Sequence, residues 1–388
     1  MKIVHVINYF QHQLGYQEYF IAKEQIKAGH EVYIITSNKY FPFPDYDNTV
    51  KPILGEREFM PKNEMVEGIN VIRLMGKYEQ PGRRIWLTGL MKNIIKIKPD
   101  YILSHGEETY STFILSAIKV FFNWKLVVDS HSHNHENRHL KKGIKTIVLQ
   151  FLTRLIVLRR KSIKIAATTE WNKQYLIKTY NLKDCDVTLI PNGSEVERFK
   201  PDINLKKSRR EKYRIQQSKV IILYTGKISK EKNPLAIIEA IKNDLSRLNI
   251  LLLLIGNIQE DYKEYFKFYY RKFGNYIMQL PAAANSEIHN FYIMSDIACW
   301  PNQSSMSAID AISSGLPIIV VSDLKERLAY NNGIGIDFND ITTLRSALLT
   351  LIENESLREN MGINSRMFAE KQLNWKSTSE KFIALTET

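Results

Sequence analysis

Short apolar stretches alternate with longer amphipathic stretches along most of the chain. Ile3–Asn8 and Val32–Thr36 are rich in β-branched residues, and between them Tyr16–Ala28 has helical spacing that ends at Gly29. Strands that alternate with helices are typical of βαβ units and of a parallel sheet covered on both faces. Further elements of this half are expected at Gly68–Leu74 (strand), Ile85–Lys96 (helix), Tyr101–Ser104 (strand), Thr109–Phe121 (helix), Leu126–Val128 (strand) and Ile163–Thr168 (strand).

The same alternation starts again after Ile190–Gly193, a segment that contains proline, asparagine and glycine. We therefore expect an α/β protein of two Rossmann-like, doubly wound domains that face a cleft: residues 1–190 with a C-terminal helix at about 374–388, and residues 191–373. Helices of the second half are expected at Pro234–Lys242, Tyr262–Phe273, Ser286–Met294, Ala308–Ser314, Ile341–Glu353, Glu355–Gln372 and Trp375–Leu385, and strands at Val220–Tyr224, Ile250–Ile255, Tyr276–Leu280, Ile297–Trp300 and Pro317–Val321.

Length and composition agree with a globular protein of more than one domain. The chain has 388 residues, of which 44% are hydrophobic and 24% charged, and chains of this length divide into domains. No run of about 18 uncharged apolar residues predicts a transmembrane helix. The two cysteines, Cys185 and Cys299, have no metal-binding spacing. They predict a reducing, cytoplasmic location without structural zinc.

The net charge of +13 is unevenly distributed. Residues 137–169 contain nine lysines and arginines and no acidic residue, and apolar runs lie between the cations. This pattern favours a helix that lies on an anionic membrane through residues 138–164, at the inner face of the plasma membrane. A core helix with solvated lysines fits the same pattern equally well. No nucleic-acid motif is present, so binding to DNA or RNA is not expected.

The chemistry-bearing feature of the second half is a strand that ends in a glycine and two cations. Tyr224-Thr225-Gly226-Lys227 is followed five residues later by Lys232. A glycine lets the backbone approach a ligand closely, and ammonium groups attract phosphate. The spacing therefore predicts a site for a diphosphate.

Motifs in this order resemble those of the retaining GT-B glycosyltransferases of family 4, a group that includes bacterial capsule, O-antigen and glycolipid enzymes. The resemblance extends over nearly the whole chain, although each motif is weak by itself. The matching segments are Gly29-His30-Glu31-Val32, Pro99–His105, Ile190–Pro201, Gly226–Lys232, Leu254–Gly256, Asp310–Pro317, Leu357–Gly362 and Asn374-Trp375.

One family feature is absent from this sequence. Family members carry two glutamates separated by seven residues, the first near the donor sugar and the second near the ribose. Here Asp310 occupies the second position and Asn302 the first. An amide still forms hydrogen bonds but carries no charge. We expect neutral groups to hold the donor sugar; a catalytically impaired protein is the alternative.

The resemblance assigns roles to the remaining candidates. It implies that Lys227 and Lys232 stabilise the leaving diphosphate, that His131 lies near the acceptor and the donor sugar, and that Asp310 accepts hydrogen bonds from the ribose. An ordinary helix-terminal charge is the alternative reading of Asp310. No metal and no bound cofactor are expected. The donor-binding residues implied in addition are Gly15, Gly226, Asn302, Gln303, Ser304, Ser305, Met306, Ser307 and Asp310.

The implied activity is transfer of a hexosyl or N-acetylhexosaminyl group from a UDP- or GDP-sugar to a hydroxyl, with retention of anomeric configuration. The expected acceptor is a carbohydrate or a lipid-linked saccharide in bacterial surface polysaccharide, O-antigen or glycolipid assembly. Another GT-B activity, such as a nucleotide-sugar epimerase or an inverting transferase, stays open. So does a catalytically impaired, membrane-associated scaffold with the same fold.

Overall fold

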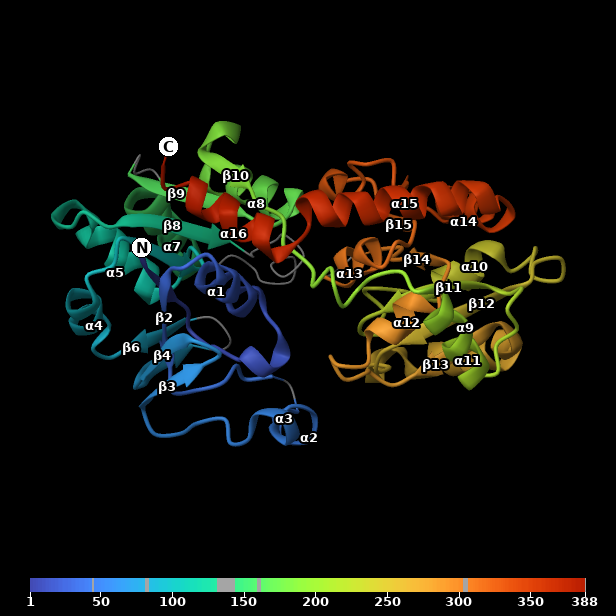
Figure 1. Ribbon diagram of the computed structural model, residues 1–388, viewed down its shortest axis with the longest axis horizontal. Helices are drawn as coiled ribbons and strands as arrows, with labels where there is room; N and C mark the ends of the chain where they lie inside the picture. Colours follow the sequence, from blue (N-terminus) through green and yellow to red (C-terminus); the bar gives the residue numbers. More distant parts are fainter. Residues whose placement is uncertain (44, 81–83, 131–143, 159–161, 303–305, 388) are drawn as a thin grey trace. The chain divides into compact units, whose positions relative to one another are not determined.

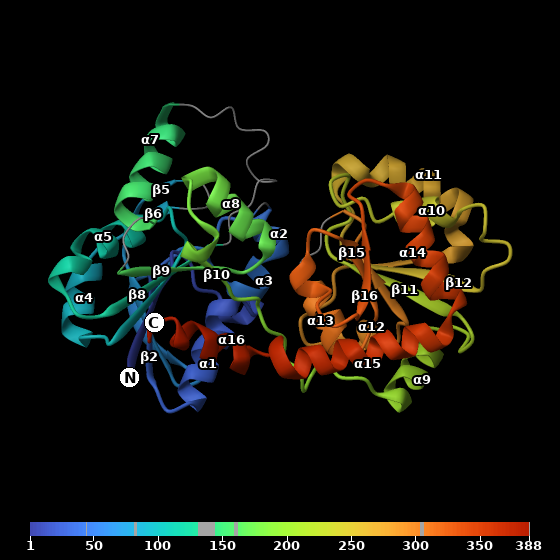
Figure 2. The same ribbon diagram turned by 90° about the horizontal axis from the view of Figure 1, so that it is seen from above.

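The computed structural model describes residues 1–43, 45–80, 84–130, 144–158, 162–302 and 306–387. It divides into two compact units: unit 1 comprises Met1–Pro191 and Trp375–Thr388, and unit 2 comprises Asn192–Asn374. In each unit, helices lie on both faces of a largely parallel sheet (Figures 1 and 2). The α/β fold class expected from the sequence is confirmed.

Unit 1 contains an eight-stranded sheet in the order β10-β9-β8-β7-β1-β2-β4-β3 among its described residues. The eight strands are β1 (Lys2–Val6), β2 (Glu31–Ser37), β3 (Lys62–Val66), β4 (Ile69–Leu74), β7 (Tyr101–His105), β8 (Lys125–Ser130), β9 (Ile163–Ala167) and β10 (Val187–Leu189). Strands β5 (Gly76–Gln80) and β6 (Arg84–Leu87) form a separate two-stranded sheet. Its helices are α1 (Gln17–Lys27), α2 (Tyr46–Thr49), α3 (Lys51–Leu54), α4 (Leu90–Ile97), α5 (Tyr110–Ile118), α7 (Ile144–Thr153), α8 (Glu170–Tyr180) and α16 (Trp375–Ala384).

The apolar strands of unit 1 supply a core on each face of the sheet. Ile102 belongs to one hydrophobic cluster, and its neighbours Tyr101 and Leu103 belong to the other. Successive side chains of a strand point to opposite faces, so a strand buried on both faces is apolar throughout. Helix α16 adds Trp375 to the second cluster, where it stacks on Phe20 of α1 with ring centroids 5.0 Å apart.

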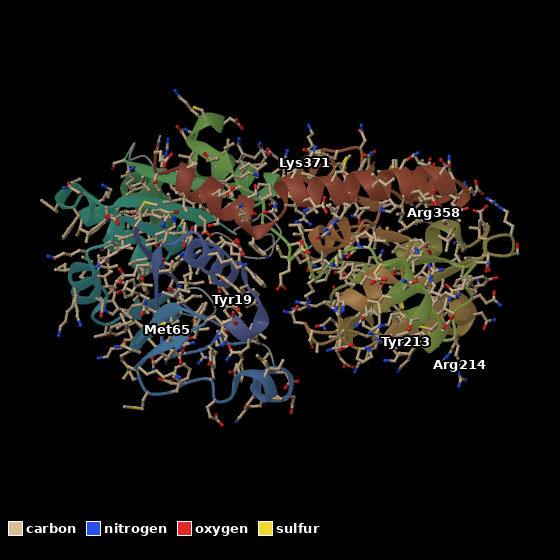
Figure 3. The ribbon with its side chains drawn as sticks, in the orientation of Figure 1. Tyr19, Met65, Tyr213, Arg214, Arg358 and Lys371 are labelled. Carbon is tan, nitrogen blue, oxygen red and sulfur yellow. The ribbon has the colours of Figure 1, made fainter. Side chains whose placement is uncertain are left out.

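The edges of unit 1 differ from a purely parallel sheet. Strand β3 pairs antiparallel with β4 at the sheet edge, where the side chain of Met65 is exposed (Figure 3).

The helix expected over Ile85–Lys96 is wrong in its first part. Strand β6 occupies Arg84–Leu87 and pairs with β5, and helix α4 begins only after Gly89, whose φ of 86° interrupts the helical backbone.

Unit 2 contains a six-stranded parallel sheet in the order β13-β12-β11-β14-β15-β16 among its described residues. The strands are β11 (Val220–Thr225), β12 (Ile250–Ile255), β13 (Ile277–Leu280), β14 (Ile297–Cys299), β15 (Ile318–Val321) and β16 (Gly333–Ile336). The helices are α9 (Ile203–Lys212), α10 (Ala236–Ile241), α11 (Lys263–Phe273), α12 (His289–Ile293), α13 (Ser307–Ser313), α14 (Ile341–Glu353) and α15 (Glu355–Gln372).

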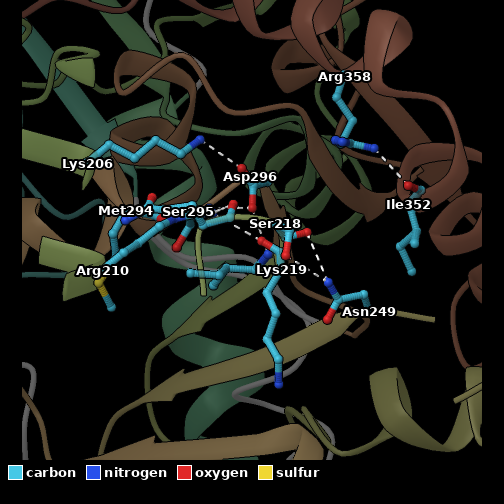
Figure 4. A network of polar contacts seen from close by, with 12 residues as sticks. Lys206, Arg210, Ser218, Lys219, Asn249, Met294, Ser295, Asp296, Ile352 and Arg358 are labelled. Carbon is cyan, nitrogen blue, oxygen red and sulfur yellow. Dashed lines mark hydrogen bonds and ion pairs between the residues drawn. The ribbon is translucent and has the colours of Figure 1, made fainter. Parts of the chain in front are cut away.

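A partly buried ionic network holds helix α9 to the amino end of β11. The carboxylate of Asp296 accepts a hydrogen bond from the Arg210 guanidinium at 2.6 Å and from the backbone N–H of Ile221 at 2.7 Å, and it pairs with Lys206 at 2.7 Å (Figure 4). Hydrogen bonds to a charged group are stronger than neutral ones. This network fixes the start of the strand whose other end carries the predicted diphosphate site.

Two of the sequence motifs meet where helix α15 crosses the segment after α13. A Cβ atom on Gly362 would lie 2.5 Å from the carbonyl oxygen of Gly315. The guanidinium of Arg366, one turn later, donates hydrogen bonds to the carbonyls of Val196, Phe199 and Ser313. Both glycine motifs therefore serve close backbone packing next to the segment that follows Asn192.

Replacing Gly362 with alanine tests this close approach. Glycine to alanine in a helix interior ordinarily increases stability, but the clash with Gly315 should reverse the sign. We expect the free energy of unfolding to fall by about 1–3 kcal/mol, measured by urea denaturation. Gly274→Ala is the matched control, because its Cβ would meet nothing closer than 3.6 Å. Equal behaviour of the two variants would contradict the clash.

Candidate functional site

The order of strands in unit 2 reverses at β11. The chain runs from β11 to β12 and β13 on one side, and then returns to place β14 on the other side. In open α/β sheets, ligands bind at the carboxyl ends of the strands where the order reverses. The residues that follow β11 and β14 lie at this position, and they include Gly226, Lys227 and Asn302.

The backbones that leave β11 and β12 are in direct contact. The N–H of Gly226 donates to the carbonyl of Ile255 at 3.0 Å. A Cβ atom on Gly256 would lie 1.9 Å from the carbonyl oxygen of Gly226, and Gly226 itself has a φ of 137°. Neither position tolerates a side chain without rearrangement. The glycines therefore keep these two strand ends together.

Lys227 and Lys232 lie on the loop that follows this glycine. The hydroxyl of Tyr224, which is buried in β11, donates to the carbonyl of Lys227 at 2.7 Å and fixes the start of the loop. Lys227 is exposed and Lys232 is partly buried. Burial lowers the pKa of Lys232, and the positive charges of Lys227 and Arg327 lower it further, against the opposite effect of Glu231. The two predicted cations are therefore brought together.

Asn302 joins the end of β14 to this loop. Its side-chain N–H donates to the carbonyl of Glu231 at 3.2 Å, next to Lys232. Two residues earlier, the indole N–H of Trp300 donates to the carbonyl of Thr225 at 3.0 Å. In this structure Asn302 positions the loop that bears Lys232. Gln303, Ser304 and Ser305, which are predicted to bind the donor, lie outside the described residues.

Helix α13 begins beside the segment that follows Pro191. The side chain of Met306 is partly exposed, and its sulfur accepts a hydrogen bond from the Asn192 side chain at 3.0 Å. Ser307, the first residue of the helix, hydrogen-bonds with the phenol of Tyr292. Met306 is thus held against the segment after Pro191, and Ser307 is held against Tyr292 of α12.

Asp310 is a carboxylate that the protein keeps largely out of water. Burial raises its pKa to about 7, and the hydroxyl of Ser194, which donates at 2.7 Å, acts in the opposite direction together with Arg198. Near neutral pH the side chain therefore changes charge. A carboxyl group in this condition binds the hydroxyls of a ribose best when it is ionised, because the ionised form accepts hydrogen bonds at both oxygens.

Two residues of the site have no motif that reveals them in the sequence. Ser194 was read only as part of the segment between the domains, yet its hydroxyl binds Asp310. Arg327 follows β15, and its charge acts on Lys232 across the strand ends. Arg327 and Lys232 are too far apart in the sequence for a motif to connect them. The two residues come to the same edge of the sheet because β11, β14 and β15 are neighbouring strands.

The remaining predicted site residues belong to unit 1. Gly15 ends a short helical turn with a φ of 66°, a conformation suited to glycine. His131 lies outside the described residues, as do His133, His135 and His139. In the turn after β7, the carboxylate of Glu108 accepts hydrogen bonds from the Arg84 guanidinium at 2.8 Å and from the Tyr180 hydroxyl at 2.6 Å.

Just before His131, a buried polar chain crosses the carboxyl ends of β1, β7 and β8. His105 contacts the carboxylate of Asp129 at 2.8 Å and His5 at 3.1 Å, and His5 also contacts the side-chain amide oxygen of Gln25 at 2.7 Å. Burial and the neighbouring His105 lower the pKa of His5 to about 3, so His5 is neutral at pH 7. This chain connects the carboxyl ends of β1, β7 and β8 to one another.

The described part of the chain lacks two features. It contains no group of three or more His, Cys, Asp or Glu residues placed to hold a metal ion. None of its helices is both long enough and apolar enough to span a membrane.

Comparison with known proteins identifies the family. The model of glycosyl transferases group 1 matches residues 206–368, and that of glycosyltransferase family 4 matches residues 19–198. These matches cover most of both units. The chain belongs to the GT-B glycosyltransferases of the family 4 type.

Individual relatives are distant. The chain is 24% identical to the UDP-Gal:alpha-D-GlcNAc-diphosphoundecaprenol alpha-1,3-galactosyltransferase of Escherichia coli over 70% of this chain and 71% of the relative. It is 23% identical to the capsular polysaccharide biosynthesis glycosyltransferase CapM of Staphylococcus aureus over 64% of this chain and 67% of the relative. The structure of HepE from Anabaena in complex with UDP superposes with a TM-score of 0.71 at 12% identity, covering 99% of each chain.

The raised pKa of Asp310 predicts a pH-dependent stability difference between the wild type and Asp310→Asn. The folded-state pKa of about 7 lies above the ordinary value of 3.8, so ionisation is penalised in the folded protein. Below pH 3.8 the carboxyl group is protonated in the folded and the unfolded protein, and its contribution to the free energy of unfolding is fully present. As the pH rises to 7, the unfolded protein ionises first, and this contribution is lost. Between pH 5 and pH 8 the wild type should lose on the order of 1–3 kcal/mol relative to the variant, measured by urea unfolding. A difference that does not change with pH would show that Asp310 is solvated.

Proposed function

We propose that the chain transfers a hexosyl or N-acetylhexosaminyl group from a nucleotide-diphosphate sugar to a hydroxyl, with retention of anomeric configuration. The acceptor would be a carbohydrate or a lipid-linked saccharide in the assembly of bacterial surface polysaccharide, O-antigen or glycolipid. Two relatives support this assignment: the Escherichia coli enzyme acts on a diphosphoundecaprenol-linked sugar, and CapM serves capsular polysaccharide biosynthesis.

The observation that carries the proposal is the pair of lysines at the strand ends of unit 2. Lys227 acts electrostatically on Lys232 in the loop that follows Gly226, where the strand order reverses. Two like charges held close together are stabilised by a bound anion. A diphosphate on these lysines would place its nucleoside toward Asp310, whose carboxylate would accept hydrogen bonds from the ribose hydroxyls.

In this arrangement the reaction needs cationic stabilisation more than a protein nucleophile. When the bond between the sugar and the diphosphate breaks, negative charge develops on the leaving group, and the ammonium groups stabilise it. The family mechanism lets the leaving diphosphate help to remove the proton of the acceptor hydroxyl. Such a mechanism suits a site in which Asn302 replaces a carboxylate.

The specific observation that favours a second function concerns Asn302. Its amide is committed to the carbonyl of Glu231 and has no charge, so a scaffold that binds nucleotide but has lost catalysis is the alternative. Such a protein would bind a nucleoside diphosphate through the same lysines and would turn over no donor. A nucleotide-sugar epimerase or an inverting transferase would turn over donor with a different product.

Nucleotide binding tests the lysine pair directly. We expect one of UDP, GDP, ADP or CMP to bind by calorimetry, and the Lys227→Ala/Lys232→Ala double variant to lose about 100-fold in affinity, because both charge-assisted contacts are removed. Lys230→Ala is the matched control, since Lys230 is an exposed lysine on the same loop. It should bind within about twofold of the wild type. Failure of all four nucleotides to bind the wild type would overturn the donor site.

The proposal also places the protein at an anionic membrane, which helix α7 would contact. In helix α7 and the turn after it, Val148, Phe151, Leu152 and Leu155 follow the spacing i, i+3, i+4, i+7, and each is at least 40% exposed. An apolar stripe that faces solvent within a segment rich in cations is typical of a helix that lies in a membrane interface. Part of the segment 138–164 lies outside the described residues.

Vesicle binding tests this surface. Phe151→Ser/Leu155→Ser should reduce cosedimentation with vesicles that contain anionic phospholipid by at least about tenfold, because two side chains no longer enter the interface. Phe268→Ser removes an apolar side chain of similar exposure from unit 2 and serves as the control. Equal binding of the two variants would exclude α7 as the contact.

A further inference from the structure

Ser194 is a buried serine beside the carboxylate that is predicted to bind the ribose. Its hydroxyl donates a hydrogen bond to Oδ1 of Asp310 at 2.7 Å. The described residues donate no other hydrogen bond to this carboxylate, and Asp310 as a whole is partly exposed. One carboxylate oxygen is therefore held by the protein, and Oδ2 is left for a ligand.

The backbone of Ser194 is fixed where the chain enters and leaves unit 2. Its N–H donates to the carbonyl of Leu373 at 2.7 Å, and Ser194 forms a parallel bridge with Asn374. Unit 2 begins at Asn192 and ends at Asn374, so these are its two terminal segments. A buried side chain on a fixed backbone has few accessible positions. The hydroxyl is therefore preorganised to donate to Asp310.

The groups around Asp310 act on its charge in both directions. Burial has the largest effect and raises its pKa to about 7, the hydrogen bond from Ser194 and the positive charge of Arg198 lower it, and Glu195 raises it. The charged or titratable side chains that the described structure places against this helix are Arg198 and Glu195 of the segment after Pro191, Tyr292 of α12 and Arg366 of α15. Burial raises the pKa of the Tyr292 phenol, which therefore stays neutral. Of the effects that favour ionisation of Asp310, the Ser194 hydrogen bond is the largest.

Ribose hydroxyls bind best to the ionised form of a carboxyl group. An ionised carboxylate accepts hydrogen bonds at both oxygens, whereas a protonated one uses an oxygen as a donor. A hydrogen bond to a charged oxygen is stronger than one to a neutral oxygen, so it favours the charged form. The Ser194 hydroxyl therefore orients the carboxylate of Asp310 and also increases the fraction of molecules in which it is ionised.

We propose that Ser194 is a positioning residue for ribose recognition: its hydroxyl holds Oδ1 of Asp310, favours the ionised carboxylate at neutral pH and leaves Oδ2 to accept hydrogen bonds from the ribose. Ser194 acts through Asp310 and does not need to touch the nucleotide. The inference rests on the proposed donor site. It adds a pH dependence of donor binding near neutrality, which a residue at the start of unit 2 controls.

The pH dependence of nucleotide-sugar binding tests this role. UDP-glucose is the probe, or GDP-mannose if only GDP binds, because it lacks the terminal phosphate that titrates at about pH 6 in a nucleoside diphosphate. We expect the wild-type affinity, measured by calorimetry, to rise about tenfold from pH 6 to pH 8 as Asp310 ionises. In Ser194→Ala the midpoint of this rise should increase by about one pH unit, so that the variant binds about fivefold more weakly at pH 7 and within about twofold of the wild type at pH 9.

Ser314→Ala is the matched control. Ser314 ends the same helix and is similarly buried, and its hydroxyl has no hydrogen-bond partner among the described residues. This variant should keep the wild-type pH profile. An analogue of the nucleotide sugar that lacks both ribose hydroxyls is the matched ligand. Its affinity should differ little between the wild type and Ser194→Ala at any pH.

The outcomes separate this inference from the donor site on which it rests. Equal weakening of Ser194→Ala at every pH would overturn the proposal, because a loss of packing alone does not depend on the charge of Asp310. An unchanged pH profile in Ser194→Ala would overturn it as well. A wild type that binds neither nucleotide sugar at any pH would instead refute the proposed donor site.

A second variant keeps the proposal testable if Ser194→Ala does not fold. In Asp310→Asn the amide oxygen still accepts the hydrogen bond from Ser194, but the side chain cannot ionise. We expect the rise in affinity for the nucleotide sugar between pH 6 and pH 8 to disappear in this variant. Persistence of that rise would show that another group titrates, and the proposal would be overturned.

Discussion

The reversal of strand order at β11 is the constraint on which the candidate site of unit 2 depends. It places the end of β11 between the ends of β12 and β14, and each neighbour supplies something different. Gly256, after β12, approaches the backbone of Gly226 so closely that no side chain fits. Asn302, after β14, holds the loop that carries Lys232. A sheet with another strand order would separate these residues, whatever their sequence motifs.

The free-energy cost of burying charged groups distinguishes this edge of the sheet from an ordinary protein surface. Exposed lysines are common on a protein with a net charge of +13, and most carry no function. Here Lys232 is partly buried near two other cations, and Asp310 is a carboxyl group that burial brings close to neutrality. The unliganded protein is destabilised by each of these features. A bound nucleoside diphosphate would relieve both, since its phosphates would neutralise the cations and its ribose hydroxyls would donate hydrogen bonds to the ionised carboxylate of Asp310.

The sequence predicted the elements with strong periodicity and the residues that belong to motifs. Helices α14 and α15 begin and end where the hydrophobic spacing placed them, because their apolar faces pack continuously on neighbouring elements. The β5–β6 hairpin could not be distinguished from a helix, since Ile85 and Leu87 fit either period. Lys227 and Lys232 were found because they follow a strand and a glycine. Whether they bind a diphosphate stays a prediction, as do the roles of Gly15, Met306 and Asp310.

Arg327 and Ser194 could not be connected to the site from the sequence, because their interactions with Lys232 and Asp310 depend on distance in space. Ser194 reaches Asp310 across more than a hundred residues of sequence, and the position of Arg327 follows from the pairing of β15 with β14. Asn302 shows the reverse case: its sequence position suggested a ligand for the donor sugar, and the structure shows its amide bound to the carbonyl of Glu231. Replacement of a carboxylate by an amide at this position therefore has a structural consequence as well as a loss of charge.

The most direct test of the central claim is a crystal structure of the protein with a bound nucleoside diphosphate. The account predicts the diphosphate at the ends of β11 and β14, within hydrogen-bond distance of the ammonium groups of Lys227 and Lys232, with the ribose hydroxyls at Asp310. A nucleotide bound to unit 1, or bound in unit 2 with its phosphates away from Lys232, would contradict it.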